Sequence, residues 1–218
     1  MHCALKLYAT AALFGCALGM TIGRVSAQGK PADVQQLFQD LQSPQKSDRA
    51  AAKLLRIATS NEEARQFLAA RLPALIEEDP APTNSDYEQG RRPIRAVWQN
   101  SAKVAGELRI AAAVPALVKW FTVSTSPGVS LGAGEEALAD TPAAMALANI
   151  GDPSVPSVQP LLSRQDSNER YHAAYVLLSI DSPKADRVLR DYARSGQDWG
   201  LADFINNRLA VRAANKHN

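Results

Sequence analysis

Apolar and polar residues follow a helical period along most of the chain. Beyond residue 28, alanine, leucine and valine recur at steps of three and four residues, and no run of β-branched or aromatic residues alternates at period two. Ile94, Val97, Ser101 and Leu108 show the helical pattern clearly. Their stripe is too narrow to close a core alone, so this helix must pack against neighbours. The pattern predicts an all-α fold.

One short alanine-rich helical segment that ends on an aliphatic residue occurs four times. The copies are residues 50–57 (AAAKLLRI), 101–108 (SAKVAGEL), 143–150 (AAMALANI) and 173–180 (AAYVLLSI). Their last residues are 51, 42 and 30 positions apart, and the last spacing fits a bare pair of helices. Such self-similarity predicts a repeat array in which each unit buries its apolar face against the next unit.

Small residues and turns recur at matching places in these segments. A close approach of helix backbones is expected at one equivalent alanine in each copy, namely Ala51, Ala102, Ala144 and Ala174. Two copies are followed at the same offset by Gly151-Asp152-Pro153 and Asp181-Ser182-Pro183. Each of these turns combines a helix stop with a proline that can begin the next helix.

The two longer spacings are explained by insertions that are rich in turn residues. We expect surface loops at residues 79–93 and 122–142. Residues 199–212 are expected to form a last helix, with Ala202, Ile205, Leu209 and Val211 among its apolar positions, that caps the final repeat. Residues 213–218 form a tail that should fray.

Several segments resemble the HEAT and armadillo superfamily of helical repeats. Residues 143–162 are similar to the short HEAT-like repeat also seen in phycobilin lyases, and residues 171–189 repeat that pattern. Residues 47–78 are similar to an armadillo unit, and residues 101–121 lie between the two styles. The resemblance implies a right-handed α-solenoid of about four to five helix pairs over residues 28–212. It also implies a binding scaffold, because lyases are a minority among these proteins.

The first 27 residues are expected to be a secretory signal peptide. Lys6 is followed by an apolar stretch from Leu7 to Ile22, and Val25-Ser26-Ala27 fits a cleavage site. A retained membrane anchor is the alternative, but the stretch falls short of the ~20 apolar residues that a spanning helix needs. A lipoprotein is a third possibility, in which Cys16 of Leu13-Phe14-Gly15-Cys16 carries the lipid, although Phe14 departs from that pattern.

Cleavage after Ala27 would leave a neutral chain without cysteine. It removes Cys3 and Cys16 with Lys6 and Arg24, so the mature chain has no disulfide and balances its acidic and basic residues. A chain of this size buries enough surface to fold without disulfides. The charge balance argues against nucleic acid as a partner. We therefore expect a secreted or periplasmic protein of a bacterial envelope.

The sequence offers little chemistry for catalysis. Residues 128–132 (GVSLG) match the G-x-S-x-G nucleophile motif around Ser130, and Asp166 and His172 follow in hydrolase order. That motif works at a strand-to-helix turn of an α/β sheet, which an all-α chain lacks, so we interpret it as part of a loop. His172 is expected to face solvent. No metal site of usual ligand spacing and no cofactor motif is found, so we expect no catalytic residue, no metal and no cofactor.

The most promising contact residues are basic and aromatic. Arg91, Arg92 and Arg95 precede Trp98, which we expect in the core, whereas Trp120 lies off the main apolar stripe of its helix. Arginine and aromatic residues are enriched at binding hot spots. The sequence therefore predicts a noncatalytic scaffold that binds a protein through Arg91, Arg92, Arg95 and Trp120. The alternatives are an enzyme or enzyme accessory like the lyases, and a lipid-anchored structural protein.

Overall fold

The computed structural model describes residues 31–78, 92–124, 138 and 140–215. Within these ranges the chain forms ten α-helices and no strand, so the predicted all-α class is confirmed. The α-helices are α1 (Pro31–Leu41), α2 (Ser47–Ala58), α3 (Glu62–Glu78), α5 (Arg92–Glu107), α6 (Val114–Lys119), α8 (Pro142–Ile150), α9 (Val155–Val158), α10 (Ser167–Ile180), α11 (Pro183–Ser195) and α12 (Trp199–Asn215). Three 3-10 segments join them, which are η1 (Ala111–Ala113), η2 (Asp152–Ser154) and η3 (Gln159–Ser163).

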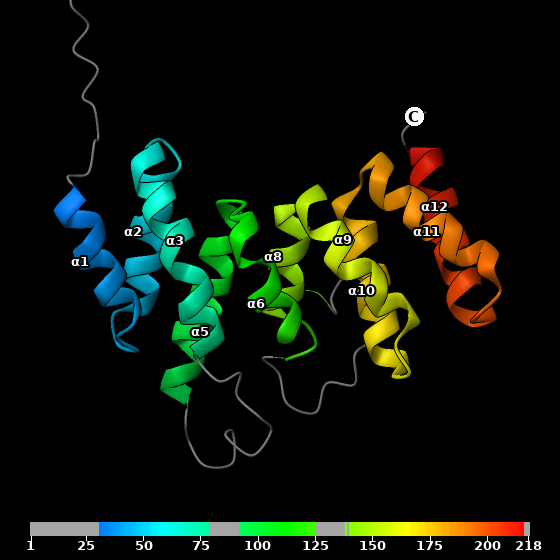
Figure 1. Cartoon of the computed structure of the whole chain (residues 1–218), viewed down its shortest axis with the longest axis horizontal. Helices are drawn as coiled ribbons and strands as arrows, with labels where there is room; N and C mark the ends of the chain where they lie inside the picture. The colour runs from blue at the N-terminus through cyan, green and yellow to red at the C-terminus, as the bar shows by residue number, and fades with distance from the viewer. Residues whose placement is uncertain (1–30, 79–91, 125–137, 139, 216–218) are drawn as a thin grey trace, which may run out of the picture.

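The helices follow one another in a row along the long axis of the molecule. Figure 1 shows α1 at one end and α12 at the other, with each helix beside its neighbours in sequence. The first helix of each pair packs on the first helix of the next pair, because α2 contacts α5, α5 contacts α8 and α8 contacts α10. Contacts between helices are therefore made mainly between adjacent layers.

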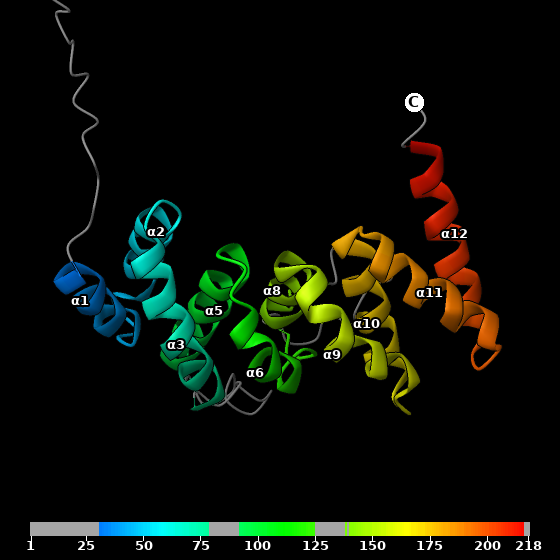
Figure 2. The same cartoon turned by 45° about the horizontal axis from the view of Figure 1, so that its top comes forward.

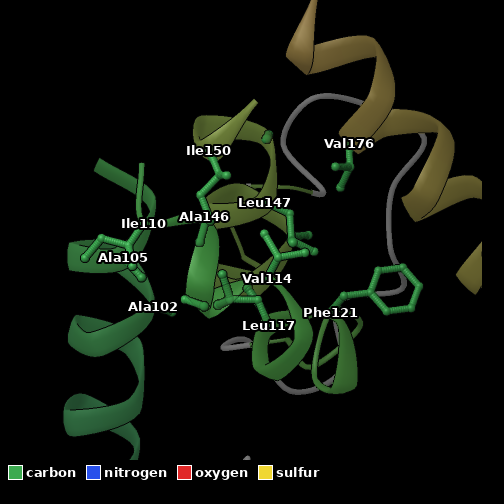
Figure 3. Close-up of a cluster of buried hydrophobic side chains, with 14 of the residues drawn as sticks. Ala102, Ala105, Ile110, Val114, Leu117, Phe121, Ala146, Leu147, Ile150 and Val176 are labelled. Carbon is green, nitrogen blue, oxygen red and sulfur yellow. The ribbon is translucent and has the colours of Figure 1, made fainter. Parts of the chain in front are cut away.

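A continuous apolar core runs through these layers. Figure 3 shows its central part, where Ala102 and Ala105 of α5 lie near Val114 and Leu117 of α6 and near Leu147 of α8. The four alanines predicted at close helix contacts are all buried, with exposures of at most 3% for Ala51, Ala102, Ala144 and Ala174. Small side chains at these positions let the helix backbones approach closely.

The closest approach of this kind is made by a glycine. A Cβ atom placed on Gly106 of α5 would lie 2.7 Å from Cα of Ala146 in α8 and 3.0 Å from its Cβ. Both distances are shorter than a carbon–carbon contact allows. The contact between α5 and α8 therefore requires glycine at position 106.

Three successive layers have a residue of positive φ at the end of the first helix. Arg109, Gly151 and Asp181 each directly follow the last residue of a repeated segment, and each has a positive φ, at 53°, 83° and 46°. Beyond the first two turns, η1 leads into α6 as η2 leads into α9. The layer that contains Arg109 lacks the Gly-Asp-Pro sequence but keeps the positive φ.

Some boundaries differ from the expectations. Pro93, assigned to the first loop, lies inside α5, and Pro142, assigned to the second loop, is the first residue of α8. Leu138, also within the second loop, is 2% exposed and belongs to the core. The last helix continues to Asn215 instead of ending at residue 212. The expected signal peptide lies outside the described residues.

Candidate interaction surface

Trp120 directly follows α6 and lies partly buried at its end. The Nζ atom of Lys119 lies 5.0 Å from the centroid of the Trp120 ring, and the same ammonium lies 3.8 Å from Oε1 of Glu77 at the end of α3. The indole Nε1 of Trp120 is buried and has no hydrogen-bond partner among the described residues. Trp120 therefore lies at an edge formed by the ends of α3 and α6.

The predicted arginines lie at the beginning of α5. Arg92 is the first residue of that helix and Arg95 is the fourth, but Arg91 and the side chains of Arg92 and Arg95 lie outside the described part of the chain. Figure 1 places the start of α5 on the same edge of the molecule as the ends of α3 and α6. Trp98, at 0% exposure, belongs to the core, as expected.

His172 is buried, so the expectation that it faces solvent is wrong. Its exposure is 2%, its Nδ1 lies 2.8 Å from the carbonyl oxygen of Asn168, and its ring packs edge-on against Phe121 at 6.3 Å between centroids. Burial lowers the pKa of His172, and the Asn168 carbonyl and the Asp166 carboxylate oppose this effect. The physical reason for the burial is that α10 lies between several helices and has no solvent-facing stripe at this position.

Asp166 and His172 do not form the acid–base pair that a hydrolase requires. The Oδ1 atom of Asp166 accepts a hydrogen bond from the backbone N–H of Asn168 at 2.7 Å and caps α10, while His172 Nδ1 contacts the Asn168 carbonyl instead. In a catalytic triad the carboxylate would bind that imidazole nitrogen. Ser130, the third candidate, lies outside the described residues.

Hollows that were not predicted lie elsewhere on the surface of the described residues, and two of them are lined by several helices. A shallow groove of about 820 Å³ crosses the edge where α5, α8 and α10 end. Its lining includes Glu107, Arg109, Asn149, Asp152 and Ser179. A smaller pocket of about 360 Å³ lies between α10 and α12. Neither hollow has a local sequence signature, because each is lined by helices from different repeats.

Trp199 is the most exposed large apolar side chain in the described part of the molecule, at 83%. It begins α12 beyond the Asp198 cap, whose Oδ1 accepts a hydrogen bond from the N–H of Leu201 at 3.1 Å. Asp198 Oδ2 also accepts hydrogen bonds from Nη2 and Nε of Arg170 at 2.8 and 3.2 Å. These hydrogen bonds lower the pKa of Asp198, the backbone bond from Leu201 contributing most. The exposed indole is therefore fixed to a rigid helix start.

The described residues contain no group of three or more histidine, cysteine, aspartate or glutamate side chains that could hold a metal ion. None of the helices in those same ranges is long and apolar enough to cross a membrane.

Comparison with known proteins finds a family match in the C-terminal half of this row of helices. Residues 140–203 match the model of the HEAT repeats. This segment is a HEAT repeat region. The HEAT region begins just before α8 and ends within α12, so it contains Gly151, Asp181 and both turns that follow the repeated segments. No curated protein and no solved structure matches the chain.

Proposed function

We propose that the protein is a noncatalytic α-solenoid scaffold that binds another protein after export from a bacterial cell. The observation that carries this proposal is the row of stacked helix pairs, whose C-terminal half is a HEAT region. Stacked helix pairs of this kind form extended surfaces that cross several repeats, and HEAT proteins generally use such surfaces to bind proteins.

Two surfaces of the described molecule suit such a partner. The first is the edge where α3 and α6 end and α5 begins, which carries Trp120 beside Lys119. The second is the groove across the ends of α5, α8 and α10. Each surface spans more than one layer, so a partner bound there would gain contacts that no single helix pair offers.

An enzymatic role is the alternative from a different class. It depends on Ser130, or on a lyase-like ligand site, and the capping role of Asp166 removes one support for the hydrolase version. Replacing Ser130 with alanine would abolish turnover by a serine nucleophile and would leave a scaffold unaffected. Export itself is tested by the mass of the processed protein, because a chain that begins at Gln28 excludes a lipid anchor on Cys16.

The scaffold proposal is tested by affinity capture from a native envelope extract. The processed chain serves as bait beside a variant that lacks residues 127–134 and a variant with Asn149→Arg, which introduces a long cation into the exposed groove at the ends of α5 and α8. Exchange of Lys53, an exposed residue of α2 that belongs to neither surface, for glutamine is the matched control. Mass spectrometry identifies what each bait retains.

One protein retained by the parent and by the control would support a scaffold. Loss of that protein with the deletion would assign the contact to residues 127–134, and its loss with Asn149→Arg would assign the contact to the groove. Retention of no protein under gentle conditions would contradict the proposal and favour a small-molecule or enzymatic role.

A further inference from the structure

The pocket between α10 and α12 lies at the end of the row of helices, where α12 packs against both α10 and α11. Figure 2 shows α12 at this end, beside α11. The pocket has a volume of about 360 Å³ and combines cationic, carboxylate, hydroxyl, amide and aliphatic side chains. Its lining residues are Tyr175, Leu178, Ser179, Asp181, Arg208, Val211, Arg212 and Asn215.

Arg212 builds one wall of the pocket and is fully engaged within the protein. Its Nη1 donates to the Leu178 carbonyl oxygen and to Asp181 Oδ1, both at 2.8 Å, and its Nη2 donates to Asp186 Oδ1 at 2.5 Å. Two carboxylates therefore neutralise this guanidinium. Arg212 holds α12 against the turn between α10 and α11 and leaves ligand binding to other side chains.

Arg208 lies one helical turn before Arg212 and has no such engagement. Within the described ranges no carboxylate lies within 4 Å of it, and its Cζ lies 5.7 Å from the centroid of the Phe204 ring. Phe204 in turn packs against Tyr175 at 4.9 Å between centroids. The aromatic pair supports an arginine that makes no ion pair among the described residues, because the pocket carboxylate, Asp181, is paired with Arg212.

Tyr175 supplies a second donor without an acceptor. The side chain is 5% exposed, and its buried hydroxyl has no hydrogen-bond partner in the described structure. A buried hydroxyl that lacks an acceptor is destabilising, so such groups in proteins need an explanation. Burial raises the pKa of Tyr175, and both the charge of Arg208 and its N–H groups facing the phenol oxygen oppose this effect, so the phenol O–H is the donor left without an acceptor. The guanidinium and the phenol thus form a pair of donors that an anionic oxygen would satisfy together.

The remaining lining residues indicate which anion fits. Val211 is 57% exposed and Leu178 is partly buried, so an aliphatic surface adjoins the two donors. Ser179 and Asn215 add uncharged polar groups that can bind a peptide N–H. The last residue of a polypeptide combines these features, because its carboxylate, its side chain and its amide nitrogen branch from one Cα.

We propose that this pocket binds the C-terminal carboxylate of a partner polypeptide whose last side chain is aliphatic. The carboxylate accepts hydrogen bonds from Arg208 and from the Tyr175 hydroxyl, and the aliphatic side chain lies on Leu178 and Val211. Charge-assisted hydrogen bonds are about twice as strong as neutral ones, so the charge of the carboxylate is what the site recognises. The pocket shares Ser179 with the groove at the ends of α5, α8 and α10, but neither Arg208 nor Tyr175 lines that groove, so the test does not depend on it.

The test uses the full chain, purified in its processed form, and calorimetric titration with short peptides. Acetyl-Ala-Ala-Leu with a free carboxylate is expected to bind at least about tenfold more tightly than its amide, which corresponds to the loss of one charge-assisted hydrogen bond. Equal affinity for the acid and the amide, or no binding of the acid at millimolar concentration, would overturn the proposal. A capped peptide with an internal glutamate tests the other source of a carboxylate, and binding as tight as that of the terminal acid would also overturn it.

Variants separate a binding role from a structural one. Arg208→Gln should remove the preference for the acid, whereas Arg194→Gln on α11, outside the pocket, should leave it intact. Tyr175→Phe should weaken binding of the acid peptide about fivefold. It should also preserve or raise the thermal midpoint of the protein, because it removes a buried hydroxyl without a partner. An acid preference that survives Arg208→Gln in a folded variant would contradict the proposal.

Discussion

Gly106 shows how one missing side chain sets the distance between two helices. Elsewhere in a helix, Gly→Ala stabilises by up to about 1 kcal/mol, because alanine has the higher helix propensity. At position 106 the new methyl group would meet the backbone of Ala146 at 2.7 Å. We therefore expect Gly106→Ala to lower the free energy of unfolding by about 1–3 kcal/mol, as overpacking does in cores. Urea denaturation followed by circular dichroism measures this loss.

Gly200 provides the matched control for this substitution. It lies in the first turn of α12, and a Cβ there would make only ordinary contacts, at 3.5 Å to the hydroxyl of Tyr171 and 3.6 Å to Oδ1 of Asp198. Gly200→Ala should leave stability unchanged or raise it slightly. A Gly106→Ala variant as stable as Gly200→Ala would contradict the close approach of α5 and α8.

His172 should make stability depend on pH in the neutral range. Because burial lowers its pKa below the ordinary value of 6.5, the unfolded chain binds the proton more readily than the folded chain. The neutral imidazole thus contributes stability that is present above pH 6.5 and is lost as the pH falls towards the folded pKa. We expect the free energy of unfolding to fall between pH 7.5 and 5.5, by no more than the ~1.4 kcal/mol that one pH unit below the unfolded pKa can contribute.

Chemical denaturation at both pH values, for the parent chain and for His172→Gln, checks this prediction. The glutamine variant lacks the titrating group, so the difference between its two free energies should be smaller than in the parent. An equal pH dependence in both proteins would show that other groups cause it.

At the scale of the helix, the positive φ after each repeated segment predicts substitutions with opposite effects on the free energy of unfolding in two layers. Arg109 is exposed and has a φ of 53°, which is strained for a residue with a Cβ. Arg109→Gly should therefore raise the free energy of unfolding by about 0.5–1 kcal/mol. Gly151→Ala, at φ 83° and ψ −141°, should lower it by about 1–2 kcal/mol although the added methyl meets no atom within 4 Å. Thermal unfolding of both variants measures these changes. A shift of the thermal midpoint in the same direction in both variants would exclude backbone strain as the cause.

The sequence predicted the helices and their small contact residues because those depend on local pattern. It predicted the turns at Gly151 and Asp181 from their residues, but not the positive φ at Arg109, where the packing of the layers overrides the local preference of a residue with a Cβ. It was wrong about His172 for a related reason. The six residues from His172 to Leu177 are all buried, so α10 is covered on several sides and a single apolar stripe gives no guide to its exposure.

The pocket at α10 and α12 was beyond prediction for a further reason. It depends on Arg212 forming ion pairs with two carboxylates while Arg208, four residues earlier, forms none among the described residues. Both arginines look alike in the sequence. Their difference arises from the turn between α10 and α11, which brings Asp181 and Asp186 to one of them only.

At the scale of the whole molecule, the row of layers predicts that stability is local. In a stack where each layer contacts mainly its neighbours, loss of packing at one end should spread only to the adjacent layer. Leu201 of α12 is fully buried, and α12 packs on α10 and α11. Leu201→Ala should cost about 2–4 kcal/mol locally, by the lost burial and the cavity it leaves.

Hydrogen exchange followed by mass spectrometry can locate this loss along the row. Leu201→Ala should speed exchange in α11 and α12 and leave α2 and α3 protected as in the parent. The same change at Leu54 of α2, which is also fully buried, should speed exchange in α2 and α3 and leave α11 and α12 protected. The reason is that α2 packs on α1, α3 and α5 at the opposite end of the row. Equal deprotection of both ends in either variant would mean that the molecule unfolds as one cooperative unit, and the layered arrangement would then not govern its stability.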